Sequence, residues 1–145
     1  MSPREKAELL EASRQEEALY RELCELYRAM AGRLRDERAP VDATWMAAQN
    51  GRATATVEAL RALAAALAPQ RLSDGAVPPE AAALWRVSAA LATEAAGVNA
   101  ELMRLARLRQ ADLSERVSRL DAGRRALAGY RPPGGMARTL AGRRA

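Results

Sequence analysis

The sequence predicts an all-α fold: an up-down-up antiparallel bundle of long helices, coiled-coil-like, with a long C-terminal helix and a flexible tail. Apolar residues recur at three- and four-residue steps over most of the 145 residues, which places them on one side of a helix. Alanine and leucine make up most of this apolar content, and both residues favour helices. Prolines fall between the periodic segments, at Pro40 and at Pro78-Pro79.

The first helix is predicted over residues 3–38. Ser2-Pro3-Arg4-Glu5 has the form of a capping box with proline at the first helical position. Pro40 disfavours helical geometry at the residue before it and sets the C-terminal limit. Glu16 falls on the apolar stripe and marks either a splayed end or a buried polar contact. The apolar members of the stripe are Leu9, Ala12, Leu19, Leu23, Leu26 and Met30.

The second helix is predicted over residues 41–67, opened by Pro40, with Asp42 favourable near its positive end. Asn50-Gly51 would normally form a turn. We interpret it as a weak point inside one helix, because the apolar pattern resumes after it, and a true break stays the alternative. Ala68-Pro69 is expected to end the helix. The predicted buried face consists of Trp45, Ala48, Thr56, Leu60, Leu63 and Leu67.

The third helix is predicted over residues 79–127, after a loop at 70–78, and Gly97 inside it permits a bend. Its apolar row recurs at sevens, in Leu84, Leu91, Val98 and Leu105. Asp112 takes the next seven-residue position, and such a slip changes the local winding of a coiled coil. The apolar pattern continues on a shifted set that we call the C-terminal stripe: Leu113, Val117, Leu120 and Leu127.

The third helix is expected to be too long for its neighbours. At about 1.5 Å per residue, the three helices span roughly 52, 42 and 72 Å. If the third starts level with the others, its last residues extend past the bundle and leave the C-terminal stripe uncovered. Burying one leucine is worth about 1.5–3 kcal/mol, so an uncovered stripe predicts a partner. The expected organisation is one bundle domain over residues 1–128 and a flexible basic tail over 129–145.

The composition gives no support to catalysis. The chain has no histidine, and its single thiol, Cys24, lies among leucines and is expected to be a buried or half-buried small apolar residue. Gly134-Gly135 lacks the strand and helix that flank a phosphate-binding loop. We therefore expect no enzyme activity, no metal, no cofactor and no small-molecule substrate. The charged N-terminal segment and the absence of any run of 18 apolar residues predict a cytoplasmic protein without a signal peptide or membrane span.

The basic residues are concentrated toward the C-terminus. Residues 78–145 hold twelve basic and six acidic side chains, a net charge of +6, whereas the whole chain carries +5. Three interpretations remain open: a solvated polar face, a surface for an acidic partner, or a nucleic-acid surface. No aromatic residues alternate with these arginines, which argues against single-strand binding. The arginines of the last helix are Arg104, Arg107, Arg109, Arg116, Arg119, Arg124 and Arg125.

Two segments carry a family resemblance. The run from Val98 to Met103 contains an asparagine, Asn99, ahead of a leucine, in a long helix that ends with Leu127-Ala128-Gly129-Tyr130-Arg131-Pro132-Pro133-Gly134. This pattern resembles the FlgN-type flagellar export chaperones, whose last helix carries an asparagine followed by a leucine pair and ends in a Tyr-x-x-x-Gly stretch. Met103 stands where the family more often has leucine. Leu9-Leu10-Glu11 and residues 18–23 also suit the family's first helix.

The resemblance implies a non-enzymatic cytosolic chaperone. Such a protein binds the C-terminal amphipathic helices of hook–filament junction proteins, keeps these flagellar hook-associated proteins from assembling early, and delivers them to the export gate. Client binding would fall to the C-terminal stripe together with Arg116 and Arg124. Tyr130 would contact the export gate, the alternative being a staple against the helix end, and Asn99 would set the bundle register.

Two other classes of protein remain open. A structural coiled-coil protein would use the same stripe to self-associate, and a client-free chaperone could also hide it in a homodimer. A basic, nucleoid-type DNA-binding protein is the less favoured alternative.

Overall fold

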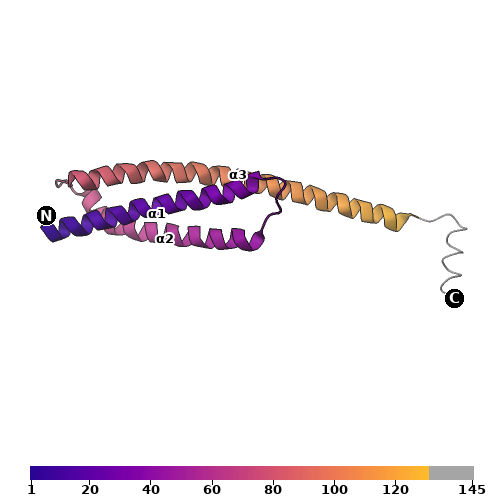
Figure 1. The fold of residues 1–145 in the computed structure, drawn as a ribbon, viewed down its shortest axis with the longest axis horizontal. Helices are drawn as coiled ribbons and strands as arrows, with labels where there is room; N and C mark the ends of the chain where they lie inside the picture. Colours follow the sequence, from indigo (N-terminus) through magenta and orange to yellow (C-terminus); the bar gives the residue numbers. More distant parts are fainter. Residues whose placement is uncertain (131–145) are drawn as a thin grey trace, which may run out of the picture. The chain divides into compact units, whose positions relative to one another are not determined.

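A computed structural model of the chain describes residues 1–130 and contains three α-helices in that part (Figure 1). They are α1 (Pro3–Arg35), α2 (Ala43–Leu72) and α3 (Pro79–Gly129). No strand occurs among the described residues, so the predicted all-α class is confirmed. None of these helices is long and apolar enough to cross a membrane.

The chain divides into two compact units, Met1–Arg107 and Leu108–Ala145. The first unit contains α1, α2 and the first part of α3, and the second contains the rest of α3. The sequence predicts a single bundle domain over residues 1–128. Most of the predicted tail, from residue 131 onward, lies outside the described residues.

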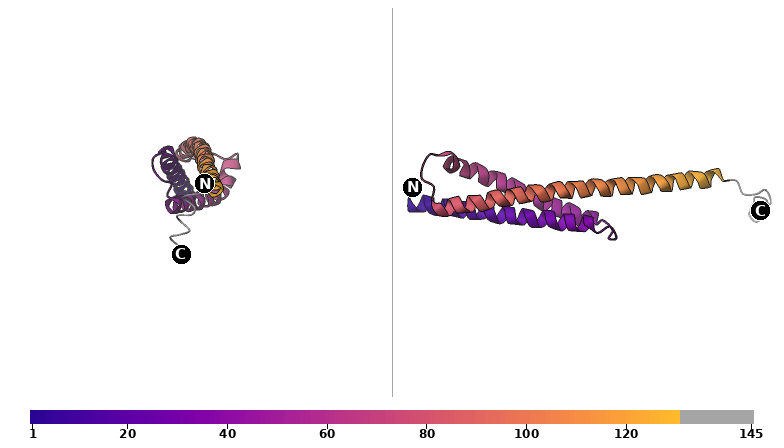
Figure 2. Two further views of the ribbon diagram at one scale, coloured as in Figure 1. Left: turned by 90° about the vertical axis from the view of Figure 1, so that its right-hand side faces the viewer. Right: turned by 90° about the horizontal axis from the view of Figure 1, so that it is seen from above.

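In the first unit the helices lie side by side with alternating direction (Figures 1 and 2). Side-chain ion pairs agree with these directions. As the residue number rises along α1, the number of the paired residue rises on α3 and falls on α2. The pairs with α3 are Lys6–Glu80, Arg28–Glu94 and Arg35–Glu101, and those with α2 are Glu16–Arg71 and Glu22–Arg52. The up-down-up topology follows from this order.

The start of α1 matches the sequence, whereas its end does not. The Ser2 hydroxyl accepts a hydrogen bond from the Glu5 amide at 3.1 Å, and the Glu5 carboxylate accepts one from the Ser2 amide at 2.6 Å. This reciprocal pair is the predicted capping box. The helix was predicted to reach residue 38 but ends at Arg35. The Asp36 carboxylate accepts a hydrogen bond from the Arg38 amide at 3.2 Å, a local turn that competes with helix.

The start of α2 also differs from the prediction, because Asp42 caps the helix instead of lying inside it. Its carboxylate accepts a hydrogen bond from the Trp45 amide at 3.0 Å, so the helix begins at Ala43. The helix then passes through Asn50-Gly51 without a break, which confirms the continuous interpretation.

The prediction that Ala68-Pro69 ends α2 is wrong, because the helix continues through Pro69 to Leu72. Proline in a helix removes one backbone hydrogen bond and costs about 3 kcal/mol in a helix interior. In α2 the proline stands only one turn from the C-terminal end. That extra turn carries Arg71, whose guanidinium forms an ion pair with the buried Glu16 of α1 at 2.5 Å.

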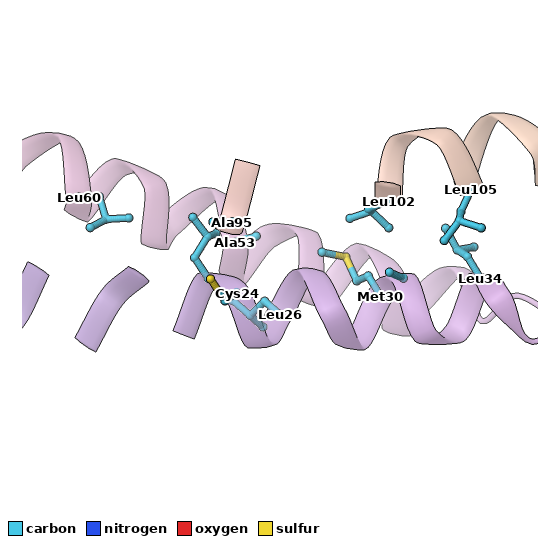
Figure 3. Packing of buried hydrophobic residues seen from close by; sticks show 11 residues of the cluster. Cys24, Leu26, Met30, Leu34, Ala53, Leu60, Ala95, Leu102 and Leu105 are labelled. Carbon is cyan, nitrogen blue, oxygen red and sulfur yellow. The ribbon is translucent and has the colours of Figure 1, made fainter. Parts of the chain in front are cut away.

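The core is built from seven-residue rows, one on each helix, as coiled-coil-like packing requires. All members are buried except Met46, which is half-buried. The rows are Leu9, Glu16, Leu23 and Met30 on α1, Met46, Ala53, Leu60 and Leu67 on α2, and Ala81, Ser88, Ala95 and Leu102 on α3. Figure 3 shows the larger cluster of buried hydrophobic residues, in which Leu105 of α3 and Leu34 of α1, two buried residues outside these rows, point toward each other.

The buried rows correct two expectations about faces. On α3 the deepest positions are mostly small residues such as Ala81 and Ala95, and of the predicted heptad leucines only Leu105 is fully buried. Small side chains allow helix axes to approach closely, which leaves the larger neighbouring leucines half-buried at the flanks. On α2 the predicted Ala48 is exposed, because the row begins at Met46, two residues earlier. Cys24 is buried, as expected.

Candidate partner-binding face

The C-terminal stripe lies on the part of α3 that belongs to the second unit. From Leu108 to Gly129 the helix has no fully buried side chain. The relative exposures of Leu113, Val117, Leu120 and Leu127 are 52%, 56%, 66% and 77%. The structure therefore leaves uncovered the four side chains for which the sequence predicts a partner.

The four stripe residues share one side of the helix. At about 100° per residue they fall within an arc of about 80°, and the step from Leu113 to Leu127 corresponds to about 21 Å. The seven-residue row that ends in Leu105 would continue at Asp112, so the apolar position moves on by one residue to Leu113. This shift amounts to about 100° around the helix axis. The stripe can therefore accept a helix of about four turns.

The charged residues beside the stripe differ in what they contact. Arg116 forms an ion pair with Asp112 at 3.0 Å, and Arg119 forms one with Glu115 at 2.5 Å. Among residues 1–130, Arg124 and Arg125 form no ion pair. Of the two arginines assigned to client binding, Arg116 thus has a carboxylate partner within its own helix. Arg124 keeps an uncompensated charge.

The two remaining predicted site residues lie in different units. Tyr130 directly follows α3 and is exposed, and its amide donates a hydrogen bond to the Leu127 carbonyl at 3.2 Å. Asn99 belongs to the first unit and is half-buried on α3. A gate-contacting role for Tyr130 and a register-setting role for Asn99 stay predictions.

A buried polar layer in the first unit was only partly foreseen. Glu16, 2% exposed, accepts the short hydrogen bond from Arg71, and the Arg71 guanidinium lies 5.0 Å from the centroid of the Trp85 ring. The Trp85 indole donates to the Ser13 hydroxyl at 2.9 Å, which in turn donates to the Leu9 carbonyl at 2.8 Å. Of the two alternatives for Glu16, the structure selects the buried polar contact.

This polar layer connects all three helices. A buried charge is stable only when it is paired and hydrogen-bonded, so a shifted register would leave the Glu16 carboxylate without its partner. The layer is therefore a structural device that aligns the bundle, a role that the sequence had suggested for Asn99. The contact of Arg71 could not be predicted from the sequence, because Arg71 follows Pro69 and falls in a segment that was expected to be a loop.

The titratable groups show only local packing effects. The pKa of Glu101 is lowered, chiefly by the hydrogen bonds that Arg104 donates at 2.6 and 2.8 Å, and burial raises the pKa of Tyr27. In the part of the chain that the structure describes, no group of three or more His, Cys, Asp or Glu side chains is placed to hold a metal. The feature left to explain is the exposed stripe.

No protein-family model matches the chain, and neither a curated protein nor a solved structure matches it. The features of the chain that point to a function are the C-terminal stripe, the charges beside it and the sequence resemblance to a chaperone family.

Proposed function

We propose that the protein is a FlgN-type flagellar export chaperone of the cytosol. It binds the C-terminal amphipathic helices of hook–filament junction proteins, prevents their premature assembly and delivers them to the membrane export gate. The observation that carries the proposal is the C-terminal stripe: four apolar side chains in one arc of α3, each more than half exposed. An exposed apolar helix face of this kind fits the apolar side of an amphipathic helix.

The size of the stripe suits a reversible complex. Full burial of four such side chains is worth about 6–12 kcal/mol, and since roughly six tenths of their surface is exposed, a partner could gain about 4–8 kcal/mol. Lost translational and side-chain freedom offsets much of this gain. Because a dissociation constant of about 1 µM requires a net gain of about 8 kcal/mol, we expect an affinity weaker than micromolar, which would allow the client to be released at the export gate.

Calorimetric titration with synthetic C-terminal peptides of flagellar hook-associated proteins tests the proposal. We expect saturable binding to the wild-type chain and none with a scrambled peptide. Leu120→Asp should abolish binding, because it places a charge in the centre of the stripe. Ala122→Asp is the matched control, since residue 122 lies at least about 140° around the helix from every stripe position.

Truncation after Ala128 separates client binding from gate contact. The shortened chain keeps the whole stripe and lacks Tyr130, so it should bind client peptide as the full chain does. If this variant no longer binds client peptide, the client site lies in the segment after Ala128 instead of on the stripe.

Two other results would replace the proposal. If the wild-type chain binds none of the peptides and sediments as a dimer at all concentrations, the stripe serves a structural coiled coil. If the chain binds no peptide but is retained on duplex DNA in a steeply salt-dependent manner, it is a basic DNA-binding protein.

A further inference from the structure

An arginine interrupts the C-terminal stripe. Leu120, Arg124 and Leu127 follow one another at steps of four and three residues, the same steps that separate the other stripe residues. At about 100° per residue, Arg124 lies about 20° from the centre of the arc, whereas Arg125 lies about 120° away. Any helix that covers the stripe must therefore also cover Arg124.

We propose that Arg124 determines which helix the C-terminal stripe accepts. The occupant is an acidic amphipathic helix of another protein, with a carboxylate opposite Arg124, and a second copy of this chain is excluded. This inference rests on the proposed function only in taking the stripe to be a partner-binding face.

The electrostatic reason is the cost of covering an unpaired charge. Among the described residues Arg124 forms no ion pair, whereas Arg116 and Arg119 are each paired with a carboxylate one turn earlier. A partner helix that removes water from the Arg124 guanidinium without offering an acceptor leaves an uncompensated buried charge. An aspartate or glutamate on the partner would instead form a charge-assisted, bidentate pair.

In the two registers that pair one stripe with the other, a second copy of the chain places no carboxylate opposite Arg124. In a parallel, in-register pair Arg124 meets the Arg124 of the other copy. In an antiparallel pair that sets Val117 against Leu120, Arg124 meets Leu113. Residues 108–130 also carry five arginines and three acidic side chains, so two copies repel each other at a net +2 each.

The chain's own C-terminal residues are no better an occupant. Residues 131–145 contain four arginines and no acidic side chain. Charge complementarity therefore favours an acidic helix from a different protein over either internal candidate.

Sedimentation velocity on a matched pair of variants tests the exclusion of a second copy. Arg124→Leu completes the apolar stripe and should convert the monomer into a dimer at micromolar concentration. Arg125→Leu removes the same charge outside the arc, so this variant should stay monomeric like the wild type. Identical behaviour of the two variants, or a dimeric wild type, would overturn the inference.

Two designed peptides test the preference for an acidic partner. Both form the same leucine-faced amphipathic helix, one with glutamates beside the leucines and one with lysines at those positions. The wild type should bind the glutamate peptide at least about tenfold more tightly, and Arg124→Glu should reverse the order. Arg125→Glu should shift both affinities much less. Failure of the wild type to bind the glutamate peptide would refute the inference, as would equal effects of the two substitutions.

The outcomes separate this inference from the proposed function. If hook-associated peptides do not bind while Arg124 still selects the acidic peptide, the chaperone assignment fails and the role of Arg124 stands. If hook-associated peptides bind equally well to the wild type and to Arg124→Glu, the chaperone assignment stands and the role of Arg124 fails. Circular dichroism of each variant confirms that the bundle is folded.

Discussion

Replacing Leu120 by aspartate should change the stability of the protein very little. Because Leu120 is 66% exposed, the folded chain gains only about a third of a full leucine burial from it, or about 0.5–1 kcal/mol. The lower helix propensity of aspartate adds roughly 0.5 kcal/mol. The expected loss in the free energy of unfolding is therefore about 1–1.5 kcal/mol.

The same substitution at Leu102 should be disruptive. Leu102 is 7% exposed and belongs to the buried seven-residue row of α3. Removing a buried leucine side chain costs about 2–5 kcal/mol, and burying a carboxylate in its place adds several more. This sum is comparable to the whole stability of a small domain, about 5–15 kcal/mol.

Urea denaturation followed by circular dichroism at 222 nm distinguishes the two cases. Leu120→Asp should keep a cooperative transition with a slightly lower midpoint, and Leu102→Asp should lose the cooperative transition. If Leu120→Asp also unfolds the protein, the C-terminal stripe belongs to a folded core. The assignment of the stripe to a partner would then be wrong.

Three further predictions concern the first unit. Arg71→Ala should lower the free energy of unfolding by about 3–5 kcal/mol, because it leaves the buried Glu16 carboxylate without its partner. Arg28→Ala, which removes one partner of an exposed pair, should lower it by less than about 1 kcal/mol. Urea denaturation of both variants measures the difference. In an NMR pH titration Glu101 should ionise below the ordinary glutamate range, and Arg104→Gln should raise its pKa. Since the folded-state pKa is lowered, this pair stabilises the protein above the ordinary carboxyl range and ceases to do so as the pH falls through the lowered pKa. Gly51→Ala should raise the free energy of unfolding by about 0.5–1 kcal/mol, because the added Cβ meets no neighbour within 4 Å. The midpoint of thermal unfolding should rise accordingly, and a lower midpoint would show that the helix is strained at this position.

The helices could be predicted from the sequence because local signals determine them. The Ser2–Glu5 capping box acts within one turn, and the apolar period carries across Asn50-Gly51 without interruption. The end of α2 could not be predicted in this way. Pro69 is a local signal to stop, whereas the contact made by the turn beyond it joins Arg71 to Glu16, which lies 55 residues away in the sequence.

The packing faces were harder to predict than the helices. Leucines were expected to form the buried face of α3, because burying them contributes most of the transfer free energy. The most deeply buried row of α3 nevertheless includes Ala81, Ser88 and Ala95. Where helices approach closely, small residues occupy the contact line and leucines flank it. The C-terminal stripe could be predicted because, in the part of the chain that the structure describes, Leu120 and Leu127 stay exposed. The partner of the stripe is a second molecule. The sequence and the fold of this chain therefore indicate only the chemical character of that partner and not which protein it is.

Hydrogen–deuterium exchange of the wild-type chain, with and without a saturating hook-associated C-terminal peptide, tests the central claim most directly. Covering the C-terminal stripe should stabilise the last part of α3. Amide exchange should therefore slow between residues 108 and 130 and stay unchanged in the bundle of residues 1–107. Slower exchange confined to residues 1–107, or no change anywhere when the peptide is bound, would contradict the claim that this stripe is the partner-binding face.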